Sequence, residues 1–168
     1  MNPCPCGYYG DSLKPCTCAP MVVTKYQKRI SGPLLDRIDI HIEVPRVDYE
    51  KLSSNRVSET SESIRARVQA ARGIQNQRFS NSANGKSADI VCNADMRIGE
   101  IRQFCQLQDE GQSLMRAAMT QLNLSARAYH RILKLARTIA DLAGSENIQS
   151  AHLAEALQYR PKIMFGTM

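Results

Sequence analysis

Four of the six cysteines stand within the first eighteen residues, as two Cys-x-Cys pairs. The pairs are Cys4 with Cys6 and Cys16 with Cys18. Four thiolates can hold a zinc ion in tetrahedral geometry and cross-link a loop that is too small to have its own core. Such a site is structural, because four sulfurs leave no open position for water. We therefore predict a zinc site. Free thiols or disulfides remain alternatives, since zinc ligand pairs usually enclose two or more residues and these enclose one.

Arg37 is a candidate for binding a phosphate. It follows the Gly32-Pro33 turn and stands directly before an alternating apolar segment, so its backbone is expected to be rigid. A guanidinium is a planar fork that suits negative charge spread over several oxygens. The alternative is an ion pair with Asp36 or Asp39.

A second basic group lies on a helix expected to run from its N-cap Ser125 to Leu142. Arg127, Arg131 and Lys134 recur at steps of four and three residues, so they share one face of that helix. The free N–H groups and the dipole of the helix N-terminus favour an anion there. A solvated basic face is the alternative interpretation. We expect the apolar face to consist of Ala128, Ile132, Leu135, Ile139 and Leu142.

Residues 85–87 spell Gly-Lys-Ser, the end of a phosphate-binding loop. Ser80 replaces the first glycine of that motif, and a helical pattern precedes the loop instead of a buried strand. We therefore interpret this segment as an ordinary loop, and no nucleotide-binding loop or acidic magnesium motif is found in the sequence.

Helical periodicity predominates in the elements that must position these residues. Residues 1–20 carry four prolines and are expected to form a loop. Residues 46–60 are polar and predict a linker. After that linker we expect a small bundle of four to five helices with short connections. The predicted helices are 21–32, 61–79, 98–105, one beginning at Asp109, the helix capped by Ser125, and 150–159.

Residues 38–44 are the one strong strand pattern. Ile38, Ile40, Ile42 and Val44 alternate with polar residues, and Pro45 ends the run. A single strand cannot satisfy its own backbone groups. We expect its partners to lie in sequence outside this chain or in another subunit.

Composition limits the possible functions. The 168 residues are 43% hydrophobic and 23% charged, which allows a buried core. The formal charge of +6 permits nucleic-acid contact without requiring it. There is no membrane-length apolar run and no basic-then-apolar leader, so we expect a cytoplasmic protein without a membrane partner.

Four long motifs resemble the magnesium-chelatase-like AAA+ ATPases of the ComM/YifB type. They are MNPCPCGYYGD at the start, RISGPLLDRIDI over residues 29–40, LNLSARAYHRILKLARTIADL over 122–142, and HLAEALQYR over 152–160. The resemblance implies that residues 1–45 are the C-terminal remnant of an α/β ATPase core, including its last strand. Residues 46–60 would then link this remnant to a helical lid over residues 61–168. The expected fold is mainly α.

The resemblance also assigns roles to single residues. Asn2 matches the sensor-1 position, which orients the attacking water, and Arg37 matches the arginine finger. Arg127 matches the sensor-2 arginine, with Arg131 beside it as a nucleotide-binding residue. Whether Arg127 acts on its own subunit's nucleotide or on a neighbour's is left open.

The implied activity is ATP hydrolysis with Mg²⁺ in a hexameric ring that remodels DNA. Because neither nucleotide motif is present, we expect this chain to be inactive alone. The alternatives are a free-standing zinc-binding DNA module, a metal chelatase subunit, and a structural helical adaptor.

Overall fold

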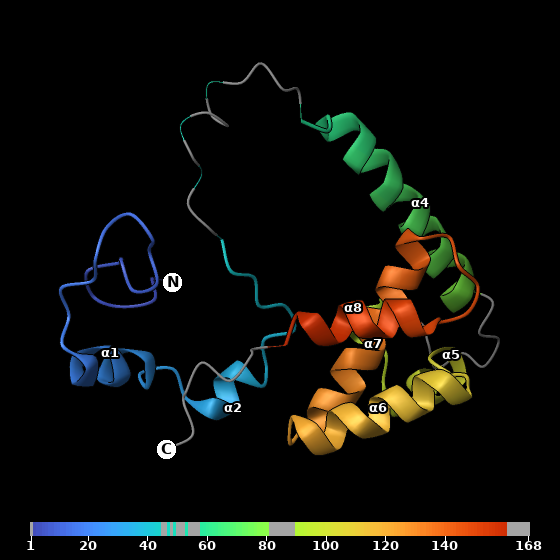
Figure 1. Cartoon of the computed structure of the whole chain (residues 1–168). Coiled ribbons are helices and arrows are strands. Elements are labelled where there is room, and N and C mark those ends of the chain that lie inside the picture. Colours follow the sequence, from blue (N-terminus) through green and yellow to red (C-terminus); the bar gives the residue numbers. More distant parts are fainter. Residues whose placement is uncertain are drawn as a thin grey trace. The chain divides into compact units, whose positions relative to one another are not determined.

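The computed structural model describes residues 2–44, 47, 49, 53, 58–80 and 90–160. The chain divides into two units, one within Met1–Arg56 and one within Val57–Arg160. Their helices are labelled in Figure 1. Most of the predicted linker, residues 46–60, lies outside the described residues, and so do the Gly-Lys-Ser loop at 85–87 and residues 161–168 of the predicted lid.

The N-terminal unit consists of a cysteine-rich loop followed by two short helices. The loop ends where α1 (Pro20–Gln27) begins, with a proline in the first helical turn. The second helix, α2 (Gly32–Leu35), also has a proline in its first turn. The predicted helix over residues 21–32 therefore ends earlier, at Gln27, and a second short helix begins at Gly32, where the prediction placed the end. Gln27 Nε2 donates to the Pro3 carbonyl at 3.2 Å and ties α1 to the loop.

Residues 38–44 do not form the predicted strand. Within the described part of the chain they belong to no helix or β-ladder. Ile40, Ile42 and Val44 are exposed. The alternating pattern is real, but a strand exists only where a neighbouring strand accepts its backbone hydrogen bonds.

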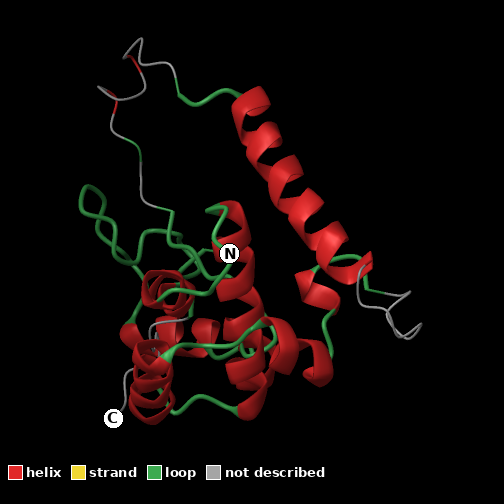
Figure 2. Cartoon of the chain, turned by 90° about the vertical axis from the view of Figure 1, so that its right-hand side faces the viewer, coloured by secondary structure: helices red, strands yellow, loops and turns green. Residues whose placement is uncertain are grey.

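The second unit is a helical bundle arranged around its most buried helix. Its elements are α4 (Ser61–Ser80), the 3₁₀ turn η1 (Asn93–Asp95), α5 (Ile98–Phe104), α6 (Asp109–Gln121), α7 (Ala126–Leu142) and α8 (Ser150–Gln158). Helix α7 packs against α4, η1, α5 and α8, and α6 packs against α8. Figure 2 shows the first half of α4 extending away from the other helices, and the side chains of residues 61–70 are all exposed.

The core of this bundle is mainly aliphatic, as expected from a chain without tryptophan, although Phe79 also belongs to it. Its fully buried members include Ile132, Ala136, Ala140, Leu153 and Ala156. The predicted mainly helical fold with a cysteine-rich loop is confirmed. None of the described helices has the length and apolar character needed to cross a membrane.

The boundaries of α7 follow from local signals in the sequence. The Ser125 hydroxyl accepts a hydrogen bond from the Ala128 backbone N–H at 3.1 Å and caps the helix. At the other end, Gly144 has a φ of 66°, the left-handed conformation that glycine adopts without strain.

Candidate metal centre and phosphate-facing arginines

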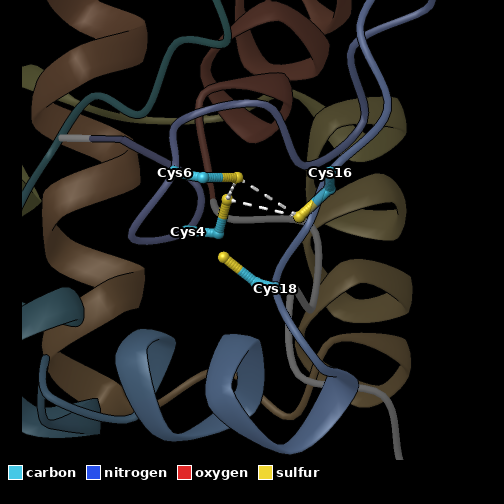
Figure 3. A group of neighbouring side chains, drawn as sticks. All are labelled: Cys4, Cys6, Cys16 and Cys18. Carbon is cyan, nitrogen blue, oxygen red and sulfur yellow. Dashed lines mark hydrogen bonds between the residues drawn. The ribbon is translucent and has the colours of Figure 1, made fainter.

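The four N-terminal cysteines meet in one cluster (Figure 3). Their Sγ atoms all lie within 4.8 Å of one another. The Cys4 Sγ atom is 3.3 Å from that of Cys6 and 3.6 Å from that of Cys16. None of the six cysteines is in a disulfide. Zinc–sulfur bonds of about 2.3 Å in a tetrahedron separate the sulfurs by about 3.8 Å. The sulfurs are therefore near the spacing that a zinc ion requires.

Two tight turns bring the cysteine pairs together. Gly7 and Gly10 have φ values of 83° and 85°, a backbone conformation that residues other than glycine adopt only with strain. The Gly7 N–H donates to the Cys4 carbonyl at 3.0 Å. The Asp11 carboxylate then accepts from the backbone N–H groups of Leu13 and Lys14. The chain therefore reverses between the pairs with little apolar packing.

The electrostatics of the cluster favour a cation. Hydrogen bonds from the backbone of Tyr8 and Thr17 lower the pKa of the Cys6 thiol to about 5. The pKa of Cys16 is raised to about 12, because desolvation and the neighbouring Cys6 sulfur outweigh the lowering by the Cys18 backbone. The Cys6 thiolate thus lies next to two thiols, Cys16 and Cys18, whose raised pKa values make them resist ionisation. A divalent metal ion would remove this conflict by replacing the protons.

Asn2 and Arg37 both lie in the N-terminal unit. Asn2 is exposed, and its side-chain amide nitrogen would be 3.7 Å from a Cβ added to Gly7, so it borders the cysteine loop. Arg37 is exposed in the turn after α2, and its Nη1 donates to the Pro33 carbonyl at 2.9 Å. Gly32 and Pro33 begin α2 instead of forming a separate turn, and the Pro33 carbonyl contacts the guanidinium directly.

Arg127 and Arg131 lie on α7 in the second unit. Arg127 is exposed in the first turn of the helix and has no hydrogen-bond or ion-pair partner within the described ranges. Arg131 is half-buried, one turn further on. Lys134, on the same face of the helix, donates from its Nζ to the Ala94 carbonyl at 2.7 Å. The exposed guanidinium at the start of this face is therefore that of Arg127.

Sequence reasoning missed a buried ionic cluster. The Asp141 carboxylate accepts from Arg78 Nη1 at 2.9 Å, Arg137 Nε at 3.0 Å and Asn93 Nδ2 at 2.7 Å. Arg137 also donates to the carbonyls of Ser145 and Glu146. Desolvation lowers the pKa of Arg137, the Asp141 charge raises it, and the Arg78 charge lowers it further.

The buried face of α7 agrees with the predicted one at Ala128 and Ile132 and differs from it elsewhere. Leu142 is 48% exposed, whereas Leu133, Ala136 and Ala140 are buried. Arg137 and Asp141 lie on this buried face, one turn apart. A charged pair at i and i+4 amid small apolar residues was a visible signal, since charges are buried in proteins only when paired.

Comparison with known proteins identifies the family. The family model described as "Magnesium chelatase, subunit ChlI" matches residues 1–52, and "Magnesium chelatase, subunit ChlI C-terminal" matches residues 58–160. The chain therefore belongs to the magnesium chelatase subunit ChlI family. The helical unit corresponds to the C-terminal part of that family.

Its relatives include proteins of the ComM/YifB type, which confirms the resemblance in the motifs. The chain is 41% identical over 164 residues to "Competence protein ComM" of Haemophilus influenzae, covering 97% of this chain and 30% of that protein. It is 40% identical over 161 residues to "Uncharacterized protein YifB" of Escherichia coli, covering 95% of this chain and 29% of that protein. "Uncharacterized protein Rv2897c" of Mycobacterium tuberculosis is 30% identical over 159 residues, which are 95% of this chain and 30% of that protein. The chain thus spans about a third of the length of these relatives.

Proposed function

We propose that this chain supplies the helical lid and three phosphate-facing groups of a magnesium-chelatase-like AAA+ ATPase. Asn2 orients the attacking water. Arg37 reaches from one subunit to the γ-phosphate of ATP held by the next, and Arg127 contacts the nucleotide from the lid. These groups would stabilise the charge that spreads over the γ-phosphate oxygens as the phosphoryl group passes to water.

The exposed position of Arg127 at the start of α7 is the observation that carries this proposal. A buried structural arginine is paired with a carboxylate, as Arg78 and Arg137 are. Arg127 instead adds its charge to the positive end of the helix dipole, without an acidic partner in the described residues. The two positive elements repel each other weakly in solvent, and an anion bound between them would be attracted by both. Arg131, one turn away, would extend the same anion-binding site.

The ATP and Mg²⁺ of this proposal need groups outside residues 1–168, because this sequence contains no complete phosphate-binding loop. We therefore expect the chain by itself to bind ATP weakly and in a salt-sensitive way, without turnover. A nucleotide titration by calorimetry tests this expectation. Micromolar affinity accompanied by ATP hydrolysis would contradict it.

Arg127 is tested in the full-length protein that carries this chain. Arg127→Ala should lower kcat for ATP hydrolysis by about 10²-fold, the usual effect of removing one group that stabilises transition-state charge. The matched control is Arg116→Ala on α6, which removes an equally exposed arginine. Equal rates for the two variants would show that Arg127 has no part in the reaction.

We also propose that Cys4, Cys6, Cys16 and Cys18 hold a structural zinc ion. The support is the approach of four sulfurs within 4.8 Å in a loop with little other packing. Zinc would supply the cross-link that this segment otherwise lacks. It would take no part in hydrolysis, because its four positions would be filled by sulfur.

For the whole assembly we propose a ring of subunits that acts on DNA in the cytoplasm. The net charge of +6 and the similarity to a competence protein support this motor. The second candidate is a chelatase-type motor, which the descriptions of the matching family models favour. Stimulation of the full-length ATPase by DNA would distinguish the two, because a chelatase-type motor has no reason to respond to it.

A further inference from the structure

A cavity of about 440 Å³ opens in the helical unit beside the buried ionic cluster. It lies between the C-terminal half of α4, the connection from α5 to α6, and the turn from α7 to α8. Apolar side chains, among them Phe104 and Ile148, line one part of it. Gln106 and Asn147 contribute side-chain amides, and both arginines of the ionic cluster reach the wall. The volume is within the range of small-ligand sites.

The charges of this wall do not balance. Arg78 and Arg137 share the single Asp141 carboxylate, and their side chains are only 13% and 3% exposed. Two guanidiniums against one carboxylate leave one positive charge in a poorly solvated place. Buried charge of this kind is costly unless a counter-charge approaches it.

Arg78 has hydrogen-bonding capacity left for a ligand. All three nitrogens of the Arg137 guanidinium already donate to Asp141 and to two backbone carbonyls. The Arg78 Nη atoms donate to Asp141 and Asn93. The Arg78 Nε has no partner in the described residues. The donor without a protein partner and the excess charge therefore belong to the same wall of the cavity.

Glu146 also lines the cavity but does not neutralise the cluster. Arg137 contacts its backbone carbonyl and not its carboxylate. Glu146 is exposed and forms no ion pair within the described ranges. Its charge is therefore in solvent, where it repels an incoming anion at the cavity edge without filling the place next to Arg78.

We propose that this cavity binds a small ligand through an oxyanion group, a phosphate or a carboxylate, that is held by Arg78 with amides such as Gln106 around it. The site is separate from the proposed nucleotide contact at Arg127. Arg137 follows Arg127 by ten residues on α7, a rise of about 15 Å along the helix. The ligand would join α4, α5 and the α7–α8 turn at the point where the ionic cluster already links α4 to α7.

The test is thermal unfolding of the 168-residue chain with inorganic phosphate, against sodium chloride at equal ionic strength. Phosphate should raise Tm in a saturable way, and chloride should not. A parallel titration with acetate determines which oxyanion the site prefers. If the cavity binds no oxyanion, any rise of Tm with phosphate or acetate will continue linearly with concentration and will not saturate, which would overturn the proposal.

Two variants localise the effect. Gln106→Glu places a carboxylate at the cavity wall, so it should raise Tm without phosphate and weaken the phosphate response about tenfold. The matched control is Gln69→Glu, which adds the same charge on the exposed part of α4. Glu146→Gln removes the repelling carboxylate and should strengthen the response about threefold. A phosphate response that is equal in Gln106→Glu and Gln69→Glu would contradict this site.

Discussion

Arg137 and Asp141 lie one turn apart on the buried face of α7, with Arg137 Nε 3.0 Å from the Asp141 carboxylate. The same carboxylate binds Arg78 from α4, and this links the long helix to the centre of the bundle. Breaking such a pair from one side is more damaging than replacing it entirely, since it leaves an uncompensated buried charge.

Asp141→Asn should therefore destabilise the helical unit strongly. It leaves two guanidiniums without a counter-charge, and we expect the free energy of unfolding to fall by about 3–5 kcal/mol. Urea denaturation followed by circular dichroism measures this loss. The exposed Asp109→Asn is the matched control and should cost less than about 1 kcal/mol, because it loses only a favourable charge in the first turn of α6. A loss below 1 kcal/mol in Asp141→Asn would show that the cluster is not needed.

Cys105 should make the protein sensitive to alkali. Burial raises the pKa of its thiol from 9.0 to about 12. Below pH 9 the thiol is neutral in both the folded and the unfolded state, and stability is fully retained. Between pH 9 and 12 only the unfolded state ionises, so stability should fall by about 1.4 kcal/mol per pH unit from this group.

Cys105→Ala isolates that contribution. The variant loses some packing energy at every pH, but its decline in stability between pH 9 and 12 should be shallower than in the parent protein. The measurement is the urea midpoint as a function of pH. Parallel declines in the two proteins would show that the buried thiol does not titrate as described.

The zinc proposal predicts one equivalent of metal per chain. Purified protein should contain stoichiometric zinc by atomic emission spectroscopy, and Cys16→Ser should lose it together with the order of the N-terminal loop. Cys92→Ser is the matched control, because this cysteine is outside the cluster and contacts Asp95 instead. A metal-free parent protein that is as stable as the zinc-loaded form would exclude the site.

The Ser125 cap is expected to contribute to stability. Ser125→Ala removes the hydroxyl that accepts from the Ala128 N–H, and the free energy of unfolding should fall by about 1 kcal/mol. Ser113→Ala, on the exposed face of α6, should have little effect. If the two variants have equal urea midpoints, the cap contributes nothing measurable.

What the sequence could predict was local. Ser125 and Gly144 are caps that act within one turn, so the bounds of α7 followed from the residues themselves. The cysteine cluster could be predicted because thiol chemistry and close spacing are both visible in the sequence. The pairing of Arg78 with Asp141 could not be, since 63 residues separate them and only the packing of α4 on α7 brings them together. Alternation alone suggested a strand at residues 38–44, but pairing is a property of two segments.

If guanidiniums of this chain act on ATP, replacing Arg37 is the most direct test of that role. The measurement is kcat for ATP hydrolysis by the full-length protein, in assemblies whose size is checked by sedimentation. We predict that Arg37→Ala lowers kcat about 10³-fold while assembly is retained, whereas Lys28→Ala, another exposed cation of the same unit, leaves it unchanged. An Arg37→Ala protein that assembles normally and keeps kcat within about twofold of the parent, far from the loss expected for an arginine finger, would contradict the account.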